Sequence, residues 1–215
     1  MPMLLTKTVY TFDELSPSAK ERARDWWRSL ENDDFDTEFV IDDAQRMAAI
    51  LGIELDTRPI TLMGGGRRYD PVVYWSGFSS QGDGASFEGR YAYAKGAAKA
   101  IRAEAPKDTE LHRIADTLQA IQRRAFYRIE ARCQHRGRYQ HSGYMQVEID
   151  NSYSSDLPYL PKGAEDAITQ AMRDFADWIY RQLEAEYEWR MANEQVDDAI
   201  TANEYTFDER GDRVD

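Results

Sequence analysis

The side chains best suited to chemistry in this sequence are carboxylates, which gather towards its two ends. The 215 residues include 39 Asp and Glu and 27 Lys and Arg, a net charge of −12. Residues 1–57 hold 6 basic and 13 acidic side chains, residues 58–163 hold 16 and 11, and residues 164–215 hold 5 and 15. The carboxylates that we select as candidates for partner binding are Asp33, Asp34, Asp36, Glu184, Glu188, Asp197 and Asp198.

These acidic segments have two interpretations. In the first, they are solvated helix faces and turns, and the basic middle of the chain neutralises them on folding. In the second, they imitate phosphates and occupy the nucleic-acid channel of a basic protein. General affinity for nucleic acid or anionic lipid is not expected, because either needs clustered Lys and Arg to displace counterions. Acid/base catalysis needs two carboxylates with separated pKa values, and sequence does not show such a placement.

A second candidate site lies in the glycine- and aromatic-rich middle of the chain. Three glycines, 64–66, precede two arginines and suggest an anion cradle, although a strand rather than a helix follows them. The aromatic residues that come next are of the type that stacks bases. The ligand-binding candidates are Arg67, Arg68, Trp75, Phe78, Gln81 and Asp83. The alternative is a glycine hairpin loop followed by a half-buried aromatic sheet.

A third group contains a thiol and two imidazoles, Cys133, His135 and His141. A hairpin turn centred on Gly137 would bring Cys133 across from His141. Zinc sites usually have four ligands, and neither a Cys-x-x-Cys nor a His-Glu-x-x-His pattern supplies the others. We therefore favour a buried thiol with two strand histidines, and expect no metal and no other cofactor. Because the serines lack a nucleophile-elbow pattern, the residues favour a protein that is not an enzyme.

Hydrophobic periodicity predicts the elements that would position these side chains. Helical spacing occurs in residues 16–30, 41–51, 95–105, 108–121 and 168–187, with Ser16 and Asp108 as N-caps. Alternating or β-rich runs predict strands at 8–12, 53–62, 72–78 and 86–93, and a hairpin over 126–149 that turns at 136–138. A short helix at 196–200 and a strand at 205–207 follow near the end. No internal repeat is evident.

Together these elements predict an α+β fold: an antiparallel sheet of about four to six strands built from hairpins, packed by amphipathic helices including a long C-terminal helix. We expect residues 1–215 to form a single α+β domain, with residues 193–215 as a partly mobile C-terminal extension. The only cysteine, Cys133, has no partner in the chain, and the sequence begins without a signal-peptide pattern. No apolar run approaches the thickness of a bilayer. A cytoplasmic protein is therefore expected.

Several segments resemble a group of uncharacterised phage and prophage proteins, some of which carry an antitoxin-like label. The likeness is carried by Tyr10–Ser16, Tyr74–Phe87, Leu111–Ala115, Tyr139–Gly143 and Ala202–Phe207. It spans nearly the whole chain, and residues 74–87 are its most specific part. The resemblance implies a phage context, residence in the host cytoplasm and interference with a host defence or toxin protein. It offers no catalytic residues.

The leading expectation is a non-enzymatic phage accessory protein that binds and neutralises a host protein through an acidic surface. Charge complementarity predicts that this partner is a basic, nucleic-acid-binding defence or toxin protein. Two alternatives stay open. One is a small-ligand, nucleotide-type binding protein or enzyme that uses the hairpin region of residues 64–91. The other is a virion or assembly component.

Overall fold

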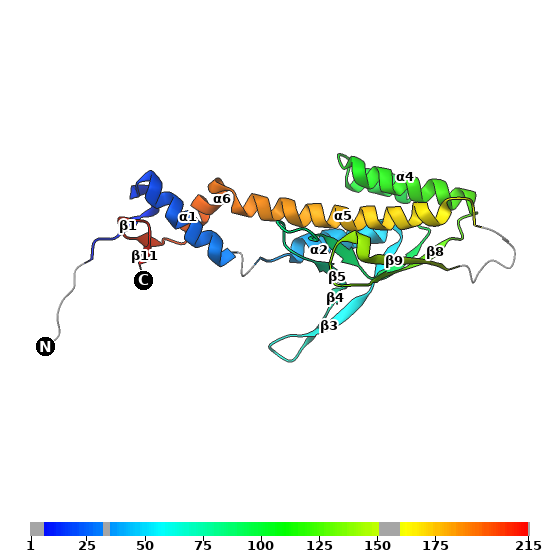
Figure 1. Ribbon diagram of the computed structural model, residues 1–215, viewed down its shortest axis with the longest axis horizontal. Coiled ribbons are helices and arrows are strands. Elements are labelled where there is room, and N and C mark those ends of the chain that lie inside the picture. The colour runs from blue at the N-terminus through cyan, green and yellow to red at the C-terminus, as the bar shows by residue number, and fades with distance from the viewer. Residues whose placement is uncertain (1–6, 32–34, 151–159, 215) are drawn as a thin grey trace. The chain divides into compact units, whose positions relative to one another are not determined.

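The computed structural model describes residues 7–31, 35–150 and 160–214 (Figure 1). The chain groups into two compact units. The terminal unit consists of residues 1–37 and 184–215, and the central unit consists of residues 38–183. Residues 193–215 thus belong with the N-terminal segment. Whether the chain folds as a single domain stays a prediction, since compactness does not measure folding cooperativity.

The central unit contains antiparallel sheets and helices, which confirms the predicted α+β class. Its elements are α2 Glu38–Leu51, β2 Ile53–Leu55, β3 Thr57–Thr61, β4 Arg67–Pro71, β5 Val73–Trp75, β6 Ala85–Phe87, β7 Gly89–Ala92, α3 Ala97–Glu104, α4 Thr109–Arg124, β8 Glu130–His135, β9 Met145–Asp150 and the first part of α5 Ala164–Met191. The main sheet has the order β2-β7-β8-β9, and β3-β4 and β5-β6 form separate two-stranded ribbons. In Figure 1 the β3-β4 ribbon extends away from the other strands of this unit.

Side-chain alternation along β8 sets the two faces of the main sheet. Ala131 and Cys133 are buried in the core, while Glu130, Arg132 and Gln134 lie on the opposite, partly exposed face. This confirms the predicted alternation. The arginine on that face is not simply solvated, because Arg132 forms a bidentate ion pair with Asp56.

The helices cover the buried face as their apolar spacing predicts. The Asp108 carboxylate caps α4, accepting hydrogen bonds from the backbone N–H of Glu110 (3.1 Å) and Leu111 (2.9 Å). Its other oxygen accepts from the Trp178 indole on α5 at 2.7 Å, which ties the two helices together. The stripe predicted for α5 is buried: Ile168, Ala171, Met172, Phe175, Trp178, Ile179 and Leu183.

Several sequence predictions fail in this unit. The run 86–93 is not one strand, because it is divided at Glu88: β6 pairs with β5, whereas β7 belongs to the main sheet. The run 53–62 is not one strand, because the chain leaves the main sheet at Asp56 and β3 pairs only with β4. His141 does not face Cys133, because Val147 occupies that register position. His141 instead lies in the connection before β9, where its Nδ1 accepts a hydrogen bond from the Gly143 N–H at 3.1 Å.

The terminal unit is built from both ends of the chain. It contains β1 Tyr10–Thr11, the 3-10 helix η1 Phe12–Glu14, α1 Pro17–Glu31, the end of α5, α6 Asn193–Ala202, β10 Thr206–Phe207 and β11 Arg213–Val214. The three strands pair antiparallel in the order β1-β10-β11. Its separate core consists of Phe12, Leu15, Ala19, Ala23, Val196, Ile200 and Phe207.

A short internal repeat lies at the centre of this unit and corrects the expectation of no repeat. The sequence Tyr-Thr-Phe-Asp-Glu occurs at residues 10–14 and again at 205–209. The two copies pair with each other, with Tyr10 opposite Phe207 and Thr11 opposite Thr206. Within the described residues, no helix of either unit is long and apolar enough to cross a membrane.

Candidate functional site

The two units carry very different charge. The terminal unit has 8 Lys and Arg against 19 Asp and Glu, a net charge of −11. The central unit has 19 against 20, a net charge of −1. The negative charge of the chain is therefore concentrated in the smaller unit.

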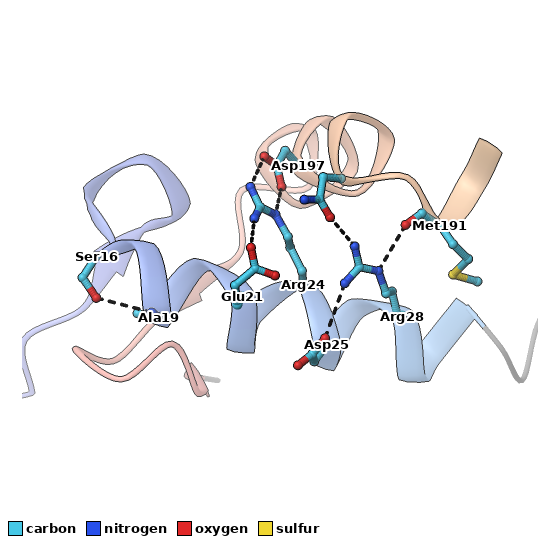
Figure 2. Close-up of polar contacts among 9 residues, drawn as sticks. Ser16, Ala19, Glu21, Arg24, Asp25, Arg28, Met191 and Asp197 are labelled. Carbon is cyan, nitrogen blue, oxygen red and sulfur yellow. Dashed lines mark hydrogen bonds and ion pairs between the residues drawn. The ribbon is translucent and has the colours of Figure 1, made fainter. Parts of the chain in front are cut away.

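An ion-pair network inside the terminal unit joins α1 to α6. The Arg24 guanidinium donates to both carboxylate oxygens of Asp197 at 2.6 Å and also binds Glu21 (Figure 2). Arg24 is well shielded, with 14% of its side chain exposed against 32% for Asp197. The hydrogen bonds and charge of Asp197 raise the pKa of Arg24 above its ordinary value. Asp197 is therefore already occupied within the unit.

A second arginine on α1 caps the C-terminal end of α5. The Arg28 Nε donates to the Met191 carbonyl at 3.1 Å, and the same guanidinium binds Asp25 and Asn193 (Figure 2). A cation at this position satisfies an end carbonyl and complements the helix dipole. At the other end of α1 the Ser16 Oγ accepts from the Ala19 N–H at 3.3 Å, in the expected capping role.

The remaining acidic candidates divide by position. Asp33 and Asp34 lie outside the described residues, and Asp36 is exposed. Glu184 is half-buried and Glu188 is exposed one turn later on α5. Asp198 is exposed on α6, one turn after Glu194. In the described part of the chain, neither pair has an ion-pair partner, in contrast to Asp197.

An exposed tryptophan follows one of these carboxylates on α5. Trp189, directly after Glu188 on α5, has 57% of its surface exposed. Ala185 and Ala192, four residues before it and three after it, are also exposed. We define the acid–Trp surface as Glu184, Glu188, Trp189, Glu194 and Asp198. Its composition, an aromatic side chain among unpaired carboxylates, is suited to a basic protein surface rather than to a metal or a small anion.

The candidate ligand site in the middle of the chain is used largely for packing. Trp75 stacks on Phe78, with ring centroids 5.6 Å apart, and Phe78 lies 5.6 Å from the Tyr180 ring of α5. The Tyr180 hydroxyl donates to the Gly77 carbonyl at 3.0 Å. This aromatic pair is thus joined to the core of the central unit.

The polar members of that candidate site also have internal roles. Arg68 on β4 binds Asp70 (2.7 Å) and Glu38 (2.8 Å), and Arg67 is exposed on the same strand. The Asp83 carboxylate accepts from the backbone N–H of Ser80 (2.6 Å) and Ser79 (3.0 Å), and the first of these bonds is the main cause of its lowered pKa. Gln81 is exposed in that turn. Ligand binding by these residues stays a prediction.

Sequence patterns did not indicate a serine–histidine contact that the fold creates. The Ser86 Oγ on β6 lies 2.9 Å from His135 Nδ1 on β8, and the Tyr74 ring lies 4.8 Å from the imidazole. Ser86 is fully buried, so a substrate would not reach its hydroxyl. Cys133 is also fully buried, and burial raises the pKa of its thiol to about 12. Across the described residues, no three His, Cys, Asp or Glu side chains are arranged to hold a metal ion.

A basic and aromatic turn between α4 and β8 was also missed. Phe126 and Tyr127 adopt positive φ angles of 53° and 60°, which residue type argues against. Arg123, Arg124 and Arg128 flank them. The cluster of arginine and aromatic residues is a weak signal of this turn in the sequence. Nothing in the sequence indicates the positive φ angles.

Comparison with known proteins identifies a family but no activity. Searches of curated proteins and of solved structures each gave no match. One family model, described as a domain of unknown function (DUF8835), matches residues 37–193. The match contains the whole central unit and leaves most of the acidic terminal unit outside it. Since the matched segment covers well over half of the 215 residues, the chain belongs to the DUF8835 family.

Proposed function

We propose that this protein is a non-enzymatic binding protein whose terminal unit docks onto a basic surface of a partner protein and covers it. The observation that carries the proposal is the charge of −11 on the terminal unit against −1 on the central unit. Arg24 and Arg28 of the terminal unit bind groups of its own helices and not the carboxylates of the acid–Trp surface.

The spacing of the carboxylates supports a role in binding a partner rather than in stabilising the fold. Glu184 and Glu188 are four residues apart on α5, and Glu194 and Asp198 are four apart on α6. Like charges at this helical spacing destabilise a helix by about 0.2–0.5 kcal/mol per pair. A partner that brings Lys or Arg to both helices would relieve this repulsion.

The exposed tryptophan gives the surface a candidate anchor. Tryptophan is enriched at the centres of interfaces, where it fills a pocket and excludes water from surrounding charge pairs. Surface carboxylates mainly speed encounter and fix orientation, whereas buried anchors slow dissociation. We therefore assign affinity chiefly to Trp189 and the rate of encounter to the glutamates and aspartates.

The class of partner follows from charge. Proteins with large basic surfaces are commonly those that bind nucleic acid, and an acidic surface can occupy the channel that phosphates would fill. With the resemblance to phage proteins, the proposed partner is a basic host defence nuclease or toxin. The mechanism would be occlusion of its nucleic-acid channel. Ligand binding by residues 64–91 and a role in virions stay alternative predictions.

The test compares capture of partners by two charge-matched variants. The first is Glu188→Gln with Asp198→Asn on the terminal unit, and the control is Asp42→Asn with Glu54→Gln, two exposed residues of the central unit. Full-length protein is immobilised and exposed to lysate of the host at low and high salt. We expect one basic protein to bind at low salt, to be released at high salt, and to bind the first variant more weakly than the control.

Two outcomes would count against the proposal. Equal loss in both variants would show that only total charge matters. If the wild-type protein retained no basic protein at low salt, the terminal unit would not bind a basic partner as proposed.

A further inference from the structure

The turn from Arg123 to Arg128, between α4 and β8, has an unusual backbone. Within the described residues, positive φ angles outside glycine occur at Phe126, Tyr127 and Glu204. Two of these are consecutive and bulky. Turns that need this conformation ordinarily use Gly, Asn or Asp, because a β-carbon is disfavoured there. Such conformations persist only where the surrounding structure imposes them.

A buried glutamine imposes this one. Gln122 is fully buried, and its Nε2 donates to the Ile129 carbonyl at 2.7 Å. The Ile129 N–H donates back to Gln122 Oε1 at 3.2 Å, so the amide closes the turn from both sides. The Tyr127 N–H also donates to the Gln122 carbonyl at 2.7 Å, and Ala125 is buried beneath the turn. The turn is therefore held in this conformation by hydrogen bonds of the chain itself.

The fixed turn holds two aromatic rings outside the core. Phe126 has 68% of its surface exposed and Tyr127 has 46%. The Tyr127 ring packs against the ring of Tyr93, which follows β7. Their centroids are 4.5 Å apart and the interplanar angle is 35°. Among the residues that the structure describes, no aromatic ring contacts Phe126 in this way, and burial does not explain its position.

The chain segments that carry these rings are basic. Residues 89–103 and 117–129, the two segments that meet at the Tyr93–Tyr127 contact, contain no Asp or Glu. Their exposed cations near the turn are Lys95, Arg123, Arg124 and Arg128. Arg124 donates to the Lys162 carbonyl at 3.3 Å, and none of the four has an ion pair in the described part of the chain. The next carboxylate along the chain, Glu130, lies 3.9 Å from Arg90.

We propose that this turn binds single-stranded nucleic acid, with bases stacked on Phe126 and Tyr127 and phosphates held by Arg123, Arg124 and Arg128. Every base offers a flat face to an aromatic ring, and guanidinium groups bind phosphate oxygens with charge-assisted hydrogen bonds. An acidic peptide would use the arginines but would leave the adjacent exposed rings without a matching partner. The site lies on the central unit and does not depend on the acid–Trp surface.

The test uses full-length protein and fluorescently labelled single-stranded oligothymidine and oligouridine, with binding followed by anisotropy. Three phosphate contacts predict that the logarithm of the binding constant falls with the logarithm of salt concentration with a slope of about −2. Phe126→Ala should weaken binding at least about fivefold, and Phe126→Trp should restore it. Arg128→Ala should make the slope shallower by about 0.7.

The matched controls are exposed residues of the same types elsewhere in the central unit. Phe39→Ala removes a phenylalanine with 78% exposure, and Arg58→Ala removes an exposed arginine of β3 that lies outside residues 64–91. Both should bind as wild type does. Binding of either strand type with these sensitivities supports the proposal, and a preference between them tells whether the ribose hydroxyl is read.

Three results would overturn the proposal. These are no binding of either strand at low salt, equal effects of Phe126→Ala and Phe39→Ala, and an oligoglutamate that binds as tightly as the oligonucleotides with the same dependence on Phe126. The last result would assign the turn to acidic peptides instead.

Discussion

The side-chain amide of Gln122 and the backbone of Ile129 form two hydrogen bonds with each other, one in each direction, at 2.7 and 3.2 Å. The end of α4 and the start of β8 are thereby joined across six residues. The same Nε2 lies 3.3 Å from the Tyr91 hydroxyl on β7, so the amide links a helix to two neighbouring strands of the main sheet.

Gln122→Ala should therefore destabilise the protein strongly. It leaves the N–H and C=O of Ile129 buried without partners, and unsatisfied buried groups cost about 1–3 kcal/mol each. We expect the free energy of unfolding to fall by about 2–4 kcal/mol in urea titrations followed by circular dichroism. The control Gln119→Ala, at an exposed position on the same helix, should change it by no more than about 0.5 kcal/mol. Similar values for the two variants would contradict a role for the amide.

The positive φ at Phe126 reverses the usual order of glycine and alanine. An L-residue in this region costs roughly 1–2 kcal/mol, which glycine avoids. We expect Phe126→Gly to be more stable than Phe126→Ala by about 1 kcal/mol in the same urea titrations. At Gln119, inside α4, glycine should instead be less stable than alanine by about 1 kcal/mol. The same order at both positions would show that the backbone of the turn is relaxed.

These features mark the boundary of what sequence could predict. Asp108 as the cap of α4 and the buried stripe of α5 follow from local spacing, and both were predicted from it. The conformation of Phe126 was not predictable, because residue preferences there favour another backbone and a buried amide overrides them.

Contacts between residues far apart in the sequence could not be predicted either. Arg24 and Asp197 are 173 residues apart, and nothing local to either residue indicates the other. The acidic candidates were chosen from charge density, so Asp197, held internally, could not be distinguished from the exposed Asp198. The pairing of residues 10–11 with 206–207 had a possible signal in their shared pentapeptide.

The Arg24–Asp197 pair should contribute measurably to the stability of the terminal unit. Charge-assisted hydrogen bonds contribute about 1.5–3 kcal/mol when shielded, and only part of each side chain is exposed. Asp197→Asn keeps the shape but removes the charge, and we expect a loss of about 1–2 kcal/mol in urea titrations. Arg22→Ala breaks a 3.5 Å pair with Asp212 in which both side chains are more than half exposed, and should cost less than about 1 kcal/mol. Equal losses would place the Arg24 pair among ordinary surface pairs.

The buried thiol predicts slow chemical modification of the folded protein. Cys133 is fully buried, and burial raises its pKa to about 12, so the reactive thiolate is scarce at pH 8. Iodoacetamide should alkylate the native protein far more slowly than protein unfolded in urea, as followed by mass spectrometry. Rapid alkylation without denaturant would mean that the strand pair β7-β8 opens readily.

The same thiol should make stability depend on pH. An unfolded cysteine has a pKa of about 8.5, so the folded thiol, with its pKa near 12, keeps its proton where the unfolded one loses it. Its contribution to stability is complete below about pH 8.5 and is lost as the pH rises towards the folded value. Between pH 8 and 9.5 this amounts to a loss of about 1 kcal/mol in the free energy of unfolding. Cys133→Ala should abolish this part of the slope whatever its effect on absolute stability, and an unchanged slope in that variant would assign the pH dependence to other groups.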